Sequence, residues 1–144
     1  MAVIRCEKCA ALNYVADDLT TAHPLCGQCG ASLDVSGAPQ PIHGGELDQA
    51  IASSPIPVLV DFWAKWCGPC HSLAPKIKKV AHDQAGKLLV LKLDVDADSN
   101  AAGRYGVQAL PTLVLFKDGQ EVGRKIGAVT RSELEGWVAG VTGG

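Results

Sequence analysis

Several features that would place this 144-residue chain in other protein classes are absent from it. No stretch approaches the roughly 20 consecutive apolar residues of a membrane-spanning helix. Thirteen basic residues oppose fifteen acidic ones, so neither a phosphate backbone nor an anionic membrane is expected as the main partner. The first ten residues contain two cysteines and three charged residues where a signal peptide would have its apolar core. We therefore expect a soluble cytoplasmic protein that binds neither nucleic acid nor a membrane.

Aromatic residues are scarce, at 5% of the chain, and residues 1–35 contain neither Trp nor Phe. A segment of that size with only scattered aliphatic residues cannot supply its own hydrophobic core, so a covalent or metal link must hold it together. Two prolines and a glycine within residues 36–41 favour an extended connection after it. The sequence thus predicts a small N-terminal unit at 1–35, a linker at 36–41 and a larger unit at 42–144.

The larger unit alternates helix-like and strand-like segments. A nearly continuous apolar run at 88–95 predicts a strand that is covered on both faces. Asp118-Gly119, between two strand-like runs, favours a tight hairpin turn. The expected order is βαβαβαββα, which makes an α/β unit with a mixed sheet flanked by helices. The assigned helices are 45–53, 68–83, 98–104 and one that opens at 130, and the assigned strands are 57–63, 88–95, 112–117 and 120–126.

Cysteine, in contrast, is plentiful, and all six cysteines fall into Cys-x-x-Cys pairs. In a reducing cytosol such pairs indicate metal ligation or catalysis rather than a disulfide framework. The first two pairs have the spacing of a four-cysteine zinc ribbon, in which one structural Zn²⁺ orders a segment too small to fold alone. Two structural disulfides, or reactive thiols, are the alternative interpretations. The expected zinc ligands are Cys6, Cys9, Cys26 and Cys29.

The third pair, Cys67-Gly68-Pro69-Cys70, follows an apolar strand and opens a helix. Backbone N–H groups at a helix start stabilise a thiolate, so Cys67 is the expected nucleophile and Cys70 the residue that resolves a mixed disulfide. Gly68 lets a substrate backbone approach, and Pro69 lacks an N–H that would otherwise be unpaired. Half of a zinc site, or two buried cysteines, is the alternative interpretation. The surroundings of this pair favour thiol–disulfide exchange.

Four motifs surround this pair: Val60-Asp61-Phe62-Trp63-Ala64, Trp66-Cys67-Gly68-Pro69-Cys70, Leu110-Pro111-Thr112 and Gly127. In these motifs the sequence resembles the thioredoxin family, over about residues 42–144. The resemblance implies a thioredoxin fold, with a five-stranded mixed sheet, and the activity of a monomeric protein disulfide reductase. It further implies disulfide-containing protein substrates and re-reduction by an NADPH-dependent thioredoxin reductase. With its four-cysteine segment, the chain resembles the zinc-containing thioredoxin 2 type across essentially its whole length.

The resemblance also implies roles for single residues around the dithiol. Asp61 would accept or relay the proton that Cys70 loses, and Lys92 would face Asp61. Burial of a carboxylate behind a strand raises its pKa, which suits proton transfer, and a hydrogen-bonded core group is the alternative for Asp61. Pro111 matches the cis-proline that lies against the active-site sulfurs in the family. The residues implied to bind substrate are Trp66, Gly68, Pro69, Leu110, Pro111, Gly127 and Ala128.

Two residues and two functional hypotheses stay open at this point. His71 departs from the Lys or Arg that many family members have after the second cysteine, and it is either simply exposed or a source of pH-dependent electrostatics. Trp63 is either a core aromatic or a direct participant. A zinc-ribbon adaptor that only binds partners is one competing function; an oxidant or isomerase is another, which Gly68-Pro69 disfavours. The ribbon itself is expected to serve interaction or redox sensing, because its few basic residues argue against nucleic-acid binding.

Overall fold

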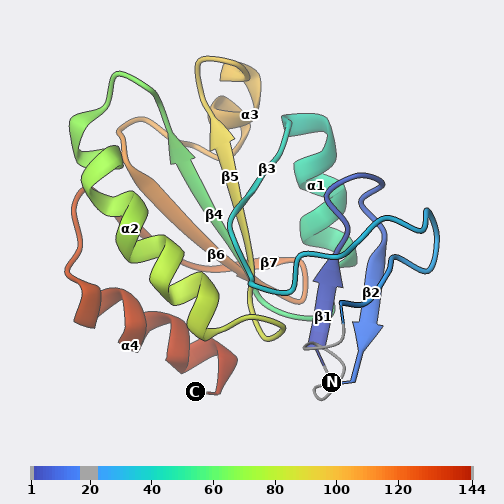
Figure 1. Ribbon diagram of the computed structural model, residues 1–144. Coiled ribbons are helices and arrows are strands. Elements are labelled where there is room, and N and C mark those ends of the chain that lie inside the picture. Colours follow the sequence, from blue (N-terminus) through green and yellow to red (C-terminus); the bar gives the residue numbers. More distant parts are fainter. Residues whose placement is uncertain (1, 17–22, 144) are drawn as a thin grey trace.

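A computed structural model describes residues 2–16 and 23–143 of the chain, so residues 1, 17–22 and 144 of the predicted units lie outside the described residues. Figure 1 shows a small two-stranded sheet beside a larger sheet that has helices on both faces. The strands are β1 (Ala2–Arg5), β2 (Leu12–Val15), β3 (Gln40–Pro41), β4 (Val58–Trp63), β5 (Leu89–Asp94), β6 (Thr112–Lys117) and β7 (Gln120–Ile126). The helices are α1 (Gly44–Ser53), α2 (Gly68–Asp83), α3 (Ser99–Arg104) and α4 (Arg131–Thr142).

The larger sheet has five strands in the order β3-β5-β4-β6-β7. Strands β3, β5 and β4 run parallel to one another. Strand β6 pairs antiparallel with both β4 and β7, which confirms the predicted mixed sheet. Strand β3 is the first strand of the expected order, for which the sequence indicated no boundaries. It lies within residues 36–41 and pairs with Leu91 and Lys92, so the last two residues of the predicted linker belong to the sheet.

Two hydrophobic clusters lie on the two faces of this sheet. Helices α1 and α3 cover one face, and α2 and α4 cover the other (Figure 1). Strand β4 is buried on both faces because its residues alternate between the two clusters: Val60 packs with α1, and Leu59 packs with α2. Of the helices in the described ranges, none has both the length and the apolar composition for crossing a membrane.

Local sequence signals fix the C-terminal third of the fold. Asp118 and Gly119 have φ angles of 53° and 78°, the left-handed conformation that a two-residue hairpin turn requires, which confirms the predicted turn between β6 and β7. The following helix α4 is capped by Thr130, whose Oγ1 accepts a hydrogen bond from the Glu133 N–H at 3.1 Å. This capping confirms the predicted start of the last helix.

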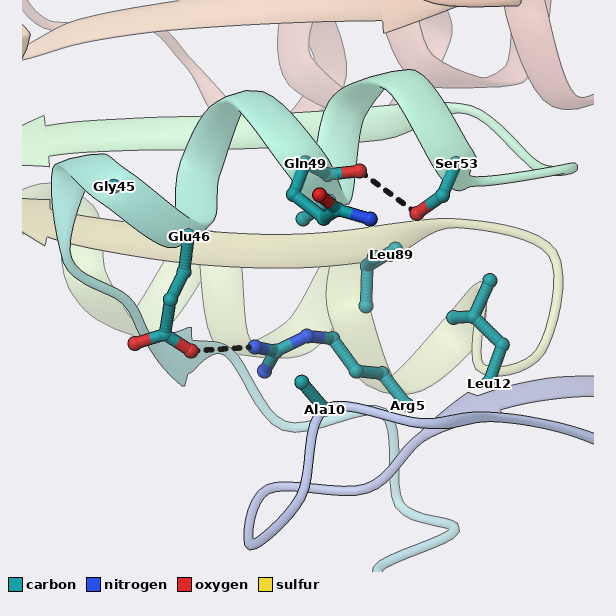
Figure 2. A pocket seen from close by; sticks show the side chains of 9 residues that line it. Arg5, Ala10, Leu12, Gly45, Glu46, Gln49, Ser53 and Leu89 are labelled. Carbon is teal, nitrogen blue, oxygen red and sulfur yellow. Dashed lines mark hydrogen bonds and ion pairs between the residues drawn. The ribbon is translucent and has the colours of Figure 1, made fainter. Parts of the chain in front are cut away.

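The small sheet is docked against the larger unit through a buried arginine. Arg5, at the end of β1, donates from Nη1 to Gln40 Oε1 at 2.8 Å, and the Gln40 amide donates back to the Arg5 carbonyl at 2.8 Å. Its Nη2 lies 3.3 Å from Glu46 Oε2 of α1. Figure 2 shows Arg5 reaching Glu46 across a cavity of about 250 Å³, which Leu12 of β2 and Gln49 of α1 also line. The guanidinium is therefore paired, although its side chain is only 5% exposed.

Backbone contacts fix the other end of strand β1. The Val3 N–H donates to the Gly86 carbonyl at 3.2 Å, just beyond the end of α2. Gly86 is in the left-handed conformation, at φ 84°, and a Cβ there would lie 2.6 Å from the Cβ of Ala2. A glycine is therefore needed at this close approach. Together with Arg5, these contacts place the small sheet beside α1 and the β3 edge (Figure 1).

Candidate active site and candidate metal centre

The Cys67/Cys70 pair lies between the end of β4 and the first turn of α2. Cys67 is the N-cap of α2, and its Sγ accepts a hydrogen bond from the Cys70 N–H at 3.2 Å. The Cys67 N–H in turn donates to the Ala64 carbonyl at 3.2 Å, which holds the turn between strand and helix. The two cysteines form a disulfide, and both residues are buried. A sulfur at this position can accept hydrogen bonds from the unpaired N–H groups of the first helical turn, and these hydrogen bonds stabilise a thiolate after reduction.

Apolar side chains surround the disulfide on the inside, and one aromatic side chain is exposed beside it. Ala64 packs with the two cysteines, and Val95 and Leu110 pack against this cluster. Trp66 is 70% exposed, which is unusual for so large an apolar residue. The Leu110–Pro111 peptide bond is cis, as the sequence resemblance implies. The disulfide is therefore packed against a few apolar side chains, and the exposed Trp66 lies next to it in the chain.

A groove of about 440 Å³ begins at Trp66. Trp66 and Leu110, both expected to bind substrate, line it together with Val95 and Val107, and Asp96 adds a charge. Sequence reasoning missed the last three, because they come from the segments around α3 and only the fold brings them beside Trp66.

The other residues expected to bind substrate are not in the groove lining. Gly127 lies behind Pro111, since its N–H donates to the Pro111 carbonyl at 2.8 Å, and Ala128 follows it along the chain. Gly68 and Pro69 lie in the first turn of α2, between the two cysteines. The expected contact residues thus fall into three places: the groove lining, the turn between the two cysteines, and the segment that is hydrogen-bonded to Pro111.

Asp61 lies in the middle of β4, directly paired with Lys92 of β5 and with Leu113 of β6. The carboxyl is largely buried, and this desolvation raises the pKa of Asp61 to about 7, with the charge of Lys92 acting in the opposite direction. Asp61 and Lys92 both line a cavity of about 270 Å³ on the α2 side of the sheet. Ala38 and Pro39, which precede β3, form part of its wall. The buried carboxyl thus faces a space through which water can deliver or remove a proton.

Two further side chains lie close to the dithiol. The exposed His71 donates from Nε2 to the Lys65 carbonyl at 2.6 Å, so its ring is tied to the loop that precedes Cys67. The Trp63 ring is half-buried, packs against the cluster around the disulfide, and lies 5.8 Å from Lys92 Nζ. His71 therefore has a backbone partner that neither interpretation of the sequence predicted. Trp63 contacts both the apolar cluster around the disulfide and the Lys92 ammonium group.

The four N-terminal cysteines converge at the end of the small sheet. Their Sγ atoms all lie within 4.8 Å of one another. The distances across the two pairs are 3.7 Å from Cys6 to Cys29 and 3.6 Å from Cys9 to Cys26. Four sulfurs at the usual Zn–S distance of about 2.3 Å form a tetrahedron with edges of about 3.8 Å, so the observed spacing fits Zn²⁺.

Each cysteine pair forms the same kind of turn. The Ala10 N–H donates to the Cys6 carbonyl at 2.9 Å, and the Gly30 N–H donates to the Cys26 carbonyl at 2.9 Å. Ala10 and Gly30 have φ angles of 67° and 77°, so both turns close through a left-handed residue. Asn13 of β2, which sequence analysis missed, donates to Cys26 Sγ at 3.6 Å and accepts from the Gly27 N–H at 2.9 Å. The two turns are therefore equivalent loops that present sulfur to a common centre.

The electrostatics of these thiols favour a cation. Hydrogen bonds from the backbone N–H groups of Cys29 and Gln28 lower the pKa of Cys26 to about 6. The hydrogen bond from the Ala11 N–H lowers the pKa of Cys9, but burial and the neighbouring sulfurs together outweigh it and raise that pKa to about 12. Four sulfurs this close cannot all ionise without a positive charge between them. The set can hold a metal ion, and the Cys9 thiol would then lose its proton to the metal.

The chemistry available at Cys67 and Cys70 is the transfer of two electrons and two protons between a dithiol and another disulfide. That is the chemistry of the thiol–disulfide oxidoreductases. Comparison with known proteins agrees, because the thioredoxin family profile matches residues 38–140. The chain belongs to the thioredoxin family.

Individual relatives show how far the likeness extends. Thioredoxin of Pseudomonas aeruginosa is 47% identical over 88 residues, which cover 61% of this chain and 82% of that protein. Thioredoxin C-3 of Corynebacterium nephridii is 36% identical over 136 residues, covering 94% of this chain and 92% of that protein. The structure of a mutant thioredoxin from Halobacterium salinarum superposes with a TM-score of 0.69 at 35% identity, covering 76% of this chain and 95% of that one. The likeness thus includes both the sheet domain and, for the second relative, most of the whole chain.

Proposed function

We propose that this chain is a protein disulfide reductase in which Cys67 attacks the substrate disulfide and Cys70 resolves the mixed disulfide. The observation behind this assignment is the N-cap position of Cys67, whose sulfur accepts the Cys70 N–H. A Cys67 thiolate is stabilised there by the first turn of α2, whereas Cys70 lies within that turn. The two sulfurs are therefore unequal before the substrate arrives.

In the proposed reaction, Cys67 thiolate attacks one sulfur of a protein disulfide and the other sulfur leaves as a thiolate. Asp61 then accepts the proton of Cys70, directly or through water in the cavity that it lines. Cys70 attacks Cys67, which breaks the bond between Cys67 and the substrate, releases the substrate sulfur as a thiolate and leaves Cys67 and Cys70 as a disulfide. A carboxyl with a pKa of about 7 has both protonation states available near neutral pH. Lys92 faces Asp61 and limits the rise of that pKa.

The substrate segment is proposed to lie beside the cis-proline. Trp66 and Leu110 offer apolar contact along the groove, and the main chain of Leu110, before the cis-proline, is proposed to pair with an extended substrate chain. Gly68, Pro69 and Ala128 complete the proposed contact surface. Family membership supports disulfide-containing proteins as substrates and an NADPH-dependent thioredoxin reductase as the source of electrons.

The test is the reduction of insulin disulfides by the wild type and two variants. Cys67→Ser removes the nucleophile, so we expect no reduction above the uncatalysed rate. Cys70→Ser keeps the nucleophile but cannot resolve, so we expect insulin trapped in a mixed disulfide with Cys67. Mass spectrometry of the trapped species identifies the bond. Reduction of insulin by the wild type without any partner protein would argue against an adaptor function. An unchanged rate of insulin reduction in both variants would contradict the proposal.

For the N-terminal segment we propose a zinc ribbon of the thioredoxin 2 type, within a division of the chain into residues 1–35, 36–41 and 42–144. Cys6, Cys9, Cys26 and Cys29 would hold one structural Zn²⁺, which supplies four metal–sulfur bonds and no redox chemistry. The close spacing of the four sulfurs supports this. Reduced thiols are needed at both sites, which supports the cytoplasm as the proposed location, and we propose that the chain acts there as a monomer.

A further inference from the structure

The Cys67/Cys70 pair and the four ribbon cysteines lie in separate clusters, in different parts of the molecule (Figure 1). Cys67 lies at the start of α2, a helix of 16 residues and thus about 24 Å long. Strand β1 contacts Gly86, beyond the other end of that helix. The turn at residues 6–10 lies beside α1, across the sheet from α2 (Figures 1 and 2). A disulfide in the ribbon therefore has to receive electrons from outside the molecule.

The ribbon sulfurs are placed to form such disulfides when the metal is lost. The Cys6–Cys29 and Cys9–Cys26 sulfurs lie 3.7 and 3.6 Å apart, so each pair needs to close by only about 1.6 Å to reach a disulfide bond. A hydroperoxide is a sufficient oxidant: two thiols give up two electrons and two protons, and the peroxide becomes water and an alcohol. The resulting ribbon has two disulfides and no thiolate with which to hold a metal.

One of the four ribbon cysteines is an exposed residue. Cys29 is exposed, whereas Cys6 and Cys26 are 2% and 3% exposed and Cys9 is half-buried. A Cβ built on the neighbouring Gly30 would meet no atom of the described residues within 4 Å. Leu25, also near this turn, is 62% exposed and offers an apolar contact to the exposed Trp66 of another copy. Attack on the outer disulfide therefore has an open approach at Cys29.

We propose that the oxidised ribbon of one copy of this chain is a substrate for the Cys67/Cys70 dithiol of a second copy, with Cys29 as the sulfur attacked. Cys67 thiolate of the donor forms a bond to Cys29, and Cys6 of the acceptor leaves as a thiolate. Cys70 of the donor then attacks Cys67, which releases Cys29 and leaves the donor as a disulfide. The freed Cys29 thiolate then attacks Cys26, which moves the second disulfide to Cys26–Cys29 and releases Cys9 as a thiolate, and a second cycle at Cys29 reduces that disulfide as well. This inference rests on the proposed reductase function.

A trapping experiment tests the contact directly. The donor is the reduced, zinc-loaded Cys70→Ser chain, and the acceptor is the full chain with Cys67→Ser and Cys70→Ser, stripped of metal and oxidised with peroxide. We expect a disulfide-linked species of twice the 15.0 kDa chain mass, and peptide mapping should find Cys67 joined to Cys29. Adding Cys29→Ser to the acceptor should abolish the cross-link. A cross-link at another ribbon cysteine, or none, would overturn the proposal.

A kinetic measurement makes the test independent of the folding of the Cys70→Ser donor. Reduced wild type is mixed with the oxidised acceptor, and free thiols and zinc uptake are followed with colorimetric reagents. We expect the initial rate to double when the donor concentration doubles, and a Cys67→Ser donor should lose the effect. A donor that reduces insulin but not the oxidised ribbon would overturn this inference and leave the reductase assignment standing. A donor that reduces neither would contradict both.

Discussion

Asp61 combines a chemical role with a structural cost. It is held on a central strand between β5 and β6, where burial raises its pKa to about 7. An ordinary carboxyl would be fully ionised at neutral pH and would accept a thiol proton poorly, whereas this one is available in both forms. The same burial penalises the charged carboxylate in the folded state. The residue that serves proton transfer should therefore make the fold less stable at higher pH.

Replacement of Asp61 by Asn should stabilise the protein above neutral pH. Between about pH 4 and pH 7 the folded wild type keeps a proton that the unfolded chain has lost, so its free energy of unfolding falls as pH rises through this window. Asn does not titrate, and the advantage of Asp61→Asn should grow to roughly 4 kcal/mol above pH 8. Urea unfolding at a series of pH values measures it, and resolution of mixed disulfides should slow in the same variant.

The control is Asp83→Asn. Asp83 is exposed, and its hydrogen bond with Lys79 lowers rather than raises its pKa. This variant should show no gain in stability above neutral pH. A constant difference between Asp61→Asn and wild type from pH 5 to pH 8.5 would contradict the account of Asp61.

At the scale of single residues, the sequence predicts best what depends on near neighbours in the chain. The helix-start position of Cys67 follows from the apolar strand before it and from Pro69 after it. The wall that Pro39 forms beside Asp61, and the contact of Val95 with the disulfide, could not be predicted. Both contacts depend on strand register and on the path of the chain before β3, which no local pattern reveals.

Helices and strands show the same division between local and distant signals. Strands β6 and β7 have the boundaries that their apolar patterns and the Asp118-Gly119 turn predict. Strand β3 has two residues, too few for any periodicity, and it exists only because β5 offers it an edge. The register shift between Leu115 and Phe116 is likewise a result of pairing and not of a sequence signal.

Helix α4 offers a test of a locally coded element. Thr130 Oγ1 accepts from the Glu133 N–H, and its hydroxyl donates to the Glu133 carboxylate, both at 3.1 Å. Thr130→Ala removes this cap, and we expect a loss of about 1 kcal/mol in the free energy of unfolding. Ser72→Ala, on the exposed side of α2, is the matched control and should change stability by less than about 0.5 kcal/mol. Equal effects of the two substitutions would argue against a capping role.

On the scale of the whole molecule, the notable arrangement is the docking of the ribbon through one buried arginine. Arg5 has hydrogen bonds to Gln40 and an ion pair with Glu46, and it thereby joins β1 to two elements that lie 35 and 41 residues further along the sequence. The sequence shows the ribbon and the sheet domain as separate patterns, so the contact between them was not predictable. An isolated arginine in a short strand carries no signal of its partner.

Arg5→Ala should loosen this docking. It leaves the Gln40 side chain without its buried donor, and we expect a loss of about 2 to 3 kcal/mol in stability. Hydrogen exchange at the Val3 N–H, which is bonded to Gly86, should become faster. Lys79→Ala, which breaks an exposed ion pair with Asp83, should cost no more than about 0.5 kcal/mol. Unchanged protection at Val3 in Arg5→Ala would show that the arginine does not hold the ribbon.

The central claim is that one motif serves two chemistries in this chain: Cys67 and Cys70 form the redox pair, and the other four cysteines hold a metal. The most direct measurement is the number of bound zinc ions and of reactive thiols in the reduced, native protein. The account predicts one zinc per chain and two reactive thiols, with all six thiols reacting once denaturation releases the metal. A reduced protein without metal, in which six thiols react in the native state, would contradict it.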